Sequence, residues 1–220
     1  MPEKKIFFMS GILTGLCFAP IYFFPGLLGF SFLAHHIYKS SHIKQSLIIG
    51  YFFGFGLFLS SLYWISFSIF VYINEFWWVF PFALLGIPLF LAIFCALFSG
   101  VMFYLRHSSY YQLLFCILWI FTEWVLSWIF SGFPWAMIGY SFAFSQILSQ
   151  SASLFGVLGL SFIAVYVGTC LYKSDDRIVL VFTSIVILAV MMLYGSERLR
   201  RFPTEYTDVT LKIVQPSIKQ

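Results

Sequence analysis

The sequence predicts an all-α polytopic membrane protein, a bundle of about seven transmembrane helices that ends in a single β-strand. Hydrophobic residues make up 61% of its 220 residues and charged residues only 9%, whereas a soluble domain carries about 25% charged residues. Such a chain has too little polar surface to cover a globular protein in water. Its solvent must therefore be the lipid bilayer. The charge-free stretches are residues 6–38, 45–74, 76–105, 124–172 and 178–196.

The first of these stretches predicts two short crossings, residues 6–19 and 21–38, instead of one long helix. Pro20 lacks the backbone N–H that a helix interior needs, and it disfavours helical geometry in the residue before it. Pro25 follows closely. The chain is therefore expected to cross and return within this stretch.

Residues 46–72 predict a third crossing and residues 77–105 a fourth, joined by a turn at Asn74-Glu75. Pro88 is expected to bend the fourth crossing, because proline removes one helical hydrogen bond. Small residues let helix backbones approach closely in a membrane. We interpret five glycines as such packing positions: Gly11, Gly15, Gly50, Gly54 and Gly56.

The second half of the chain predicts three more crossings, which cover residues 109–130, 146–172 and 178–196. A charge-free aromatic corner, residues 131–145, follows the first of them. That crossing carries Glu123, which we expect roughly 10 Å from its outer end at a rise of 1.5 Å per residue.

The basic residues predict the orientation. With the N-terminus in the cytoplasm, every basic residue between crossings faces the cytoplasm, as the positive-inside rule requires. These residues are Lys4, Lys5, Lys39, Lys44, Arg106, Lys173 and Arg177. Seven crossings then place the C-terminus outside, together with Arg198, Arg200 and Arg201. A following exported domain would explain this group, because long domains translocate largely regardless of charge.

The last part of the chain changes character. Residues 207–214 alternate polar and apolar side chains and are rich in β-branched residues, which predicts a β-strand. A single strand does not fold alone, so we expect the sequence to stop at the start of a soluble domain. The predicted division is a transmembrane helical domain, residues 1–200, and a linker with this strand, residues 201–220.

Neither the cysteines nor the net charge indicates a metal, a cofactor or a nucleic acid. All four cysteines lie inside apolar runs without ligand-like spacing, where a thiol is usually a small buried hydrophobe. They are Cys17, Cys95, Cys116 and Cys170. The net charge of +4 comes from basic residues between apolar runs, where they set topology and do not form a nucleic-acid surface.

The candidate functional residues concentrate in TEWVLSWIFSGFPWAMIGYS, residues 122–141. Glu123 is the acidic residue of this block, and a carboxylate inside a crossing is costly enough to suggest a function. It would contact a lipid headgroup or the base of a soluble domain. The alternative is a structural anchor bonded within the bundle.

Aromatic residues of the same block are candidates for contact with lipid or substrate. With Glu123, the candidate set is Trp128, Phe133, Pro134, Trp135 and Tyr140. Trp135, together with Phe133 and Pro134, would contact a lipid chain. The alternative is an aromatic belt at the membrane interface, where tryptophan and tyrosine are enriched; this interpretation is favoured for Trp64 and Tyr140.

Five blocks in the same order resemble the apolipoprotein N-acyltransferases of bacterial inner membranes. They are GILTGLCFAP with a proline soon after (11–25), GYFFGFGLFLSSLYWI (50–65), the 122–141 block, SLFGVLGLSF (153–162) and LKIVQPSIKQ (211–220). The last resembles the first strand of the family's nitrilase-like second domain. The chain departs from the family pattern at Leu126, where a basic residue is usual, and at Ser217 and Lys219, where asparagine and proline are usual.

The resemblance implies a two-step acyl transfer. A cysteine of the nitrilase-like domain takes an acyl chain from a phospholipid as a thioester and passes it to the N-terminal cysteine amine of a diacylated apolipoprotein. A glutamate base and a lysine complete the triad. None of the three matches a position of this chain, so no catalytic residue is assigned. We expect a membrane portion that is inactive alone, from a truncated or split gene, with membrane lipid and a separately encoded nitrilase-like domain as further partners.

A second class of function is a non-catalytic membrane protein, such as a lipid-binding scaffold or a transporter. A transporter predicts two related halves with discontinuous helices. Residues 1–105 and 106–196 show no convincing repeat. The acyltransferase interpretation is therefore favoured.

Overall fold

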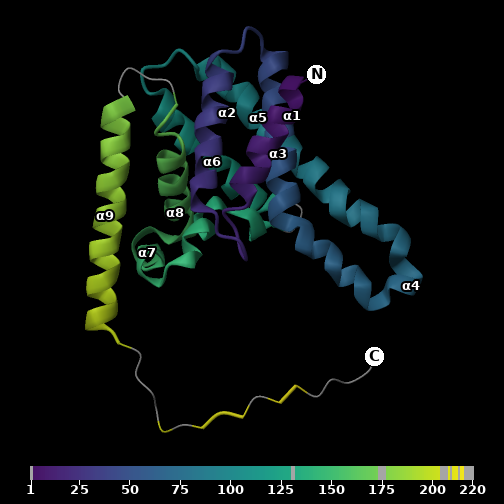
Figure 1. Cartoon of the computed structure of the whole chain (residues 1–220), viewed down its shortest axis with the longest axis vertical. Helices are drawn as coiled ribbons and strands as arrows, with labels where there is room; N and C mark the ends of the chain where they lie inside the picture. The colour runs from purple at the N-terminus through teal and green to yellow at the C-terminus, as the bar shows by residue number, and fades with distance from the viewer. Residues whose placement is uncertain are drawn as a thin grey trace.

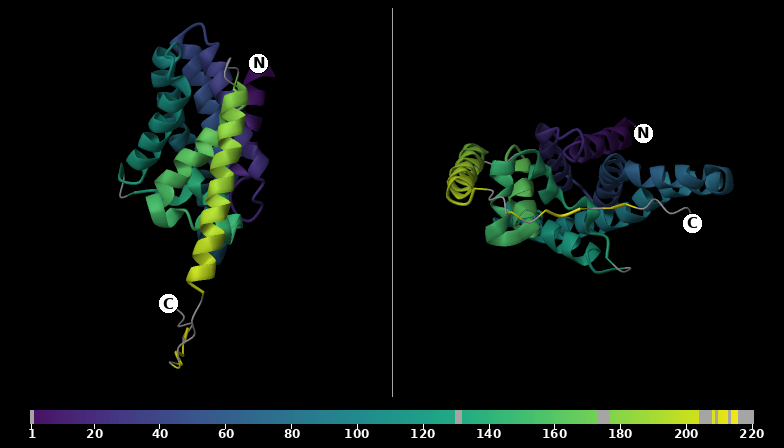
Figure 2. Two further views of the ribbon diagram at one scale, coloured as in Figure 1. Left: turned by 90° about the vertical axis from the view of Figure 1, so that its left-hand side faces the viewer. Right: turned by 90° about the horizontal axis from the view of Figure 1, so that it is seen from below.

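The computed structural model describes residues 2–129, 132–172, 177–203, 208, 210–212 and 214–215. Most of these residues are helical, and the helices stand side by side in an upright bundle (Figure 1). A helical hairpin leaves the bundle on one side, and helix α9 stands on the opposite side. The view from below shows the hairpin and α9 at opposite ends (Figure 2).

The elements follow the predicted crossings, but several crossings are divided. In chain order they are α1 (Pro2–Gly15), η1 (Phe24–Leu28), α2 (Gly29–Tyr38), α3 (Ile43–Leu62), η2 (Tyr63–Tyr72), α4 (Ile73–Phe76), η3 (Trp77–Val79), η4 (Phe82–Gly86), α5 (Ile87–Leu105), α6 (Tyr111–Leu126), η6 (Pro134–Ala136), η7 (Ile138–Phe144), α7 (Gln146–Ser149), α8 (Ala152–Gly168) and α9 (Arg177–Arg201).

The predicted break between the first two crossings is confirmed. Helix α1 ends at Gly15, and α2 begins at Gly29 after the short helix η1. The chain reverses between them, where the Phe23 N–H donates to the Leu16 carbonyl at 2.8 Å. Pro20 lies inside this reversal, as its missing N–H and fixed φ require.

Helices α1 and α3 pack backbone against backbone through glycines that the sequence marked as packing positions. A Cβ atom added at Gly11 would lie 2.0 Å from the Phe53 carbonyl oxygen. A Cβ atom added at Gly56 would lie 2.1 Å from the Phe8 carbonyl oxygen. Neither distance is possible for real atoms, so only glycine permits this crossing.

The hairpin consists of η2, α4, η3 and η4, and its tip is α4 (Figure 1). The tip contains Asn74 and Glu75, so the predicted turn is confirmed. The return helix departs from α-geometry in the π-helical turn η4, just before Pro88 in the first turn of α5. Such π-turns and prolines are the usual causes of helix bends.

Helix α6 ends at Leu126, earlier than the predicted crossing. Glu123 therefore lies in the last turn, about 5 Å from the helix end instead of roughly 10 Å, at a rise of 1.5 Å per residue. The predicted end was too late because the aromatic run after Leu126 is as apolar as the helix. Composition alone does not show where such a helix stops.

Among the residues described, three helical segments are long and apolar enough to cross a membrane. They are Ile43–Val79, Phe82–Leu105 and Arg177–Arg201, and Tyr111–Leu126 and Ala152–Gly168 are shorter apolar helices. The count of about seven crossings is thus not confirmed. The described residues between 207 and 214 form no strand, since a strand needs a partner strand for its hydrogen bonds. Lys173, one of the residues that predicts the orientation, lies outside the described ranges.

Candidate functional site

Glu123 joins the end of α6 to the aromatic corner. Its side chain is only 5% exposed. The Oε1 atom accepts a hydrogen bond from the Trp119 indole N–H at 2.9 Å and another from the backbone N–H of Ile138 at 2.8 Å. The second bond spans 15 residues and fixes the corner onto α6.

Trp119 is the residue that sequence reasoning missed. It is 3% exposed, and its ring packs edge-on against Phe30 of α2 and Phe98 of α5, with centroid distances of 4.7 Å and 5.2 Å. It precedes Glu123 by four residues, a spacing that places two side chains on the same helix face. This four-residue spacing is the sequence feature that could have identified Trp119 as a partner of Glu123.

The corner has two further attachments. The Phe133 N–H donates to the Leu126 carbonyl at 2.8 Å, which reverses the chain directly after α6. The Gly139 N–H donates to the Ser161 hydroxyl of α8 at 2.9 Å. Hydrogen bonds to α6 and α8 therefore hold the start and the middle of this segment of short 3₁₀ helices, whose backbone groups need partners at membrane depth.

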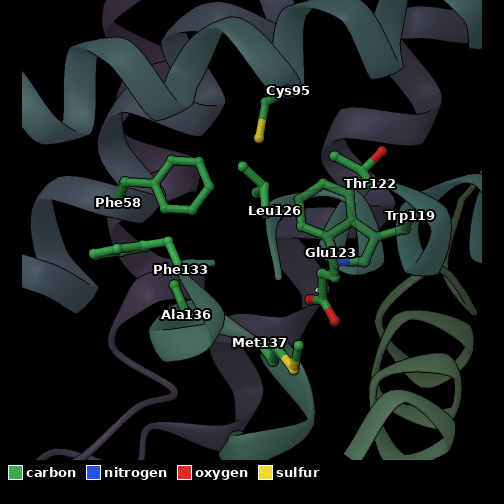
Figure 3. A pocket seen from close by; sticks show the side chains of 9 residues that line it. All are labelled: Phe58, Cys95, Trp119, Thr122, Glu123, Leu126, Phe133, Ala136 and Met137. Carbon is green, nitrogen blue, oxygen red and sulfur yellow. Dashed lines mark hydrogen bonds between the residues drawn. The ribbon is translucent and has the colours of Figure 1, made fainter. Parts of the chain in front are cut away.

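A small cavity of about 20 Å³ lies beside Glu123 (Figure 3). The other lining residues are Phe58, Cys95, Trp119, Thr122, Leu126, Phe133, Ala136 and Met137. The second carboxyl oxygen, Oε2, is buried, and the Ser161 hydroxyl of α8 lies near the carboxyl group. The cavity has room for about one water molecule.

A larger apolar groove of about 410 Å³ adjoins this cavity. One wall comes from the end of the hairpin and the start of α5, and the other from the end of α6 and the corner. The lining residues are Phe82, Gly86, Ile87, Phe90, Leu91, Leu126, Ile129 and Phe133. Leu126 and Phe133 line both spaces, so they separate the carboxyl group from the groove. The volume of the groove is within the range of small-molecule binding sites.

The structure brings together only two of the six predicted contact residues, Glu123 and Phe133. Trp135 is 58% exposed, and its ring packs against Trp64 of the hairpin at a centroid distance of 5.5 Å. The remaining three, Trp128, Pro134 and Tyr140, are exposed and do not line either space. The groove residues of the hairpin and α5 were not predicted, because their contribution depends on how the hairpin bends.

The four cysteines are buried, as their apolar surroundings predicted, and all four are free thiols in the structure. Cys95 lines the cavity beside Glu123, where its Sγ atom points toward the open space (Figure 3). Within the described ranges, no three side chains of the histidine, cysteine, aspartate or glutamate type lie together as a metal site would need.

Comparison with protein families finds one match that covers most of the chain. Residues 10–170 match the model described as "Apolipoprotein N-acyltransferase N-terminal domain". The matched region begins in α1 and ends just after α8, so it contains the groove, the cavity and the corner.

Curated relatives give the same result. The apolipoprotein N-acyltransferase of Rickettsia prowazekii is 46% identical over 222 residues, which cover 99% of this chain and 45% of the relative. The protein of that name from Rickettsia bellii is 47% identical over 96% of this chain and 44% of its own length. The one from Rhodopseudomonas palustris is 31% identical over 83% and 36%. The chain thus spans less than half the length of the relatives it matches.

Proposed function

Because this chain belongs to the apolipoprotein N-acyltransferase family, we propose that it forms the membrane-embedded part of an enzyme of lipoprotein biosynthesis. The enzyme would transfer an acyl chain from a phospholipid to the N-terminal cysteine amine of a diacylated apolipoprotein. The task of the membrane part is to bring the acyl chain to the reacting groups.

The observation that carries this proposal is the apolar groove between the hairpin and the aromatic corner. Its lining residues are all apolar apart from Gly86, so it suits a hydrocarbon chain and offers nothing to a polar solute. It lies at the corner end of α6, which the predicted orientation places at the outer surface of the membrane. A lipid of the outer leaflet would reach it without leaving the bilayer.

Glu123 acts in this proposal as a positioning residue. It is too buried to contact a lipid headgroup directly, and its Oε1 atom already binds two N–H groups of the chain. Through Ile138 it determines where the corner lies, and the corner supplies Phe133 to the groove wall. Trp128, Pro134, Trp135 and Tyr140 would contact surrounding lipid or the incoming lipoprotein.

The location that fits this role is a bacterial inner membrane, with the N-terminus in the cytoplasm and the C-terminus in the periplasm. The catalytic cysteine, glutamate and lysine would come from a nitrilase-like domain that receives the acyl chain from the groove. We further propose that residues 1–220 have no acyltransferase activity without such a domain.

A chimeric enzyme tests the proposal. This chain would replace the aligned 45% of the Rickettsia prowazekii relative, in a bacterium depleted of its own N-acyltransferase. We expect the chimera to restore N-acylated lipoproteins, detected by mass spectrometry of the N-terminal peptide, and the 220-residue chain alone to restore none. A thioester-linked acyl group on the chain alone would contradict the proposal that the nitrilase-like domain supplies the catalytic residues.

A substitution that fills the groove tests whether the groove binds the acyl chain. Gly86 lines the groove, and a Cβ atom added there would have no atom within 4 Å, so Gly86→Leu adds a large side chain at the groove wall without displacing the backbone. We expect the chimera with Gly86→Leu to insert normally and to lose N-acylation by roughly tenfold, the effect of about 1.4 kcal/mol of binding. Ile93→Phe is the control, because Ile93 is an exposed residue of α5 outside the groove. Equal activity of the two variants would exclude the groove as the acyl site.

A further inference from the structure

One face of α9 changes from apolar to basic along its length. Ile187, Met191, Tyr194, Arg198 and Arg201 follow one another at spacings of three or four residues, which places them on the same side of the helix. The face therefore offers hydrocarbon contact along the helix, then a phenol, then two guanidinium groups at its C-terminal end. The apolar residues would contact the acyl chains of a phospholipid, and the guanidinium groups would contact its phosphate.

The apolar part of this face borders a groove of about 210 Å³ between α8 and α9. Helix α8 is broken at Gly156, whose φ of 68° and ψ of −173° are accessible essentially to glycine alone. The first turn of α8 is therefore tilted relative to the rest of the helix. The groove walls include Leu154, Phe155 and Ile163 of α8 and Val186, Val190 and Met191 of α9.

The groove has a polar end near the start of α8. Ser151 lines it there, is 1% exposed, and its hydroxyl has no hydrogen-bond partner among the described residues. Tyr194 lines the same end, and its hydroxyl shares a 2.9 Å hydrogen bond with the Ser153 hydroxyl. The hydroxyls of Ser151, Ser153 and Tyr194 thus make this end of the groove more polar than its walls.

A second, basic pocket of about 250 Å³ continues from this end, and Tyr194 lines both spaces. Arg198, Arg201 and Glu197 line this pocket, and Gln150, the residue after α7, accepts a hydrogen bond from Arg198. Glu197 binds Arg200 at 2.8 Å and Arg201 at 2.5 Å. Three arginines against one glutamate leave a net positive charge at the end of α9.

We propose that the α8–α9 face is a binding site for one anionic phospholipid. Its acyl chain occupies the apolar groove, and its phosphate binds Arg198. Charge complementarity selects this occupant over an apolar helix, because an apolar helix carries no anion to balance the net positive charge at the end of α9. The site shares no lining residue with the groove and cavity at the corner, so it is separate from the proposed acyl donor site.

This site explains two features of the protein that the proposed acyl-transfer role does not explain. In the predicted orientation, Arg198 and Arg201 lie on the side of the membrane that the positive-inside rule disfavours, and a bound phosphate would stabilise them there. Helix α9 also has few buried residues, namely Ser184, Met191 and Gly195. A lipid in the groove would fill the remaining gap between α9 and α8.

Lipid titration by native mass spectrometry tests the site. The 220-residue chain would be stripped of lipid in detergent and titrated with dioleoyl-phosphatidylglycerol, and the dissociation constant of the first bound lipid measured. We expect Arg198→Ala to weaken this constant roughly tenfold, the effect of losing one charge-assisted hydrogen bond. Arg200→Ala is the matched control: it removes the same charge from the same helix end, but Arg200 does not line the pocket. Equal losses in the two variants would show diffuse charge attraction and refute the site.

A second pair of variants tests the groove independently of charge. Val190→Trp fills the groove, whereas Leu193→Trp adds the same ring to an exposed position outside it. We expect roughly a tenfold loss of phosphatidylglycerol binding from the first variant and less than a twofold change from the second, with equal helix content by circular dichroism. An unchanged affinity in Val190→Trp, or displacement of the lipid by inorganic phosphate alone, would overturn the proposal.

Discussion

The two sides of the bundle are packed in different ways. On the α1–α3–α5 side, helix backbones meet at glycines, and the largest interior side chains, such as Phe53 and Phe30, are fully buried. On the α9 side, a single helix exposes most of its length, and a groove separates it from α8. In a bilayer, apolar burial does not distinguish a neighbouring helix from a lipid tail, so close packing decides which helices associate. Among the described residues, close helix contacts therefore hold the first side, whereas the second side carries the proposed lipid site.

The largest effect is expected from Trp119→Ala. Trp119 is the meeting point of α2, α5 and α6 and also donates to Glu123. Loss of a buried tryptophan costs about 3–5 kcal/mol. The free energy of unfolding, measured by SDS titration in mixed micelles, should fall by this amount. Trp128→Ala is the control: Trp128 is 72% exposed, and a comparable loss there would contradict the distinction between interior and lipid-facing positions.

The next largest effect is expected from Gly56→Ala. The added methyl group would meet the Phe8 carbonyl oxygen at 2.1 Å, so α1 and α3 must separate. Overpacking of this kind costs about 1–3 kcal/mol, measured by the same titration. Gly86→Ala makes the same change in open space and should be neutral or stabilising by up to about 1 kcal/mol. If both substitutions have the same effect, the glycine contact does not hold the two helices together.

A somewhat smaller effect is expected from Glu123→Ala. It leaves the Trp119 and Ile138 N–H groups buried without an acceptor, at a cost of about 2 kcal/mol. Hydrogen exchange of the corner, residues 132–145, should accelerate, whereas Glu123→Gln retains an acceptor oxygen and should keep most of the protection. Thr122→Ala is the control, since the Thr122 hydroxyl bonds only within its own helix. Slow exchange in Glu123→Ala would show that the corner does not depend on this carboxyl group.

The smallest effect is expected from Leu193→Ala on α9. Leu193 is 73% exposed and lies outside the lipid groove, and substitutions at such positions usually change stability by less than about 0.5 kcal/mol. SDS titration should show no shift outside this range. A loss of more than 1 kcal/mol would mean that another part of the protein or a second copy covers this face.

The sequence predicted well the features that depend on a few neighbouring residues. Pro20 implied the break between α1 and α2, and Asn74-Glu75 implied the hairpin turn, because the first limits backbone geometry and the second is polar within an apolar run. It predicted poorly the features that depend on distant residues. The end of α6 at Leu126 was missed, since the hydrogen bond that reverses the chain there has no compositional signature.

The candidate site shows the same limit. Glu123 and Phe133 were identified from residue type and resemblance, and both lie at the cavity. Trp119 and the hairpin residues of the groove were not identified, because one depends on packing between three helices and the others on a bend in the hairpin. Trp128 and Tyr140 are exposed. Residue type does not distinguish such lipid-facing aromatic residues from those that line a cavity, because lipid and protein interior are equally apolar.

The sequence by itself determined that this protein belongs in a membrane, where its chain must break, and which family it resembles. These properties follow from hydropathy, proline geometry and local motifs, all of which are written in adjacent residues. Only the tertiary structure decided that Glu123 holds the backbone of Ile138, that the bent hairpin completes an apolar groove, and that α9 leaves room beside α8. These properties depend on contacts between segments far apart in the chain, and in an apolar solvent such contacts are selected by shape rather than by hydrophobicity.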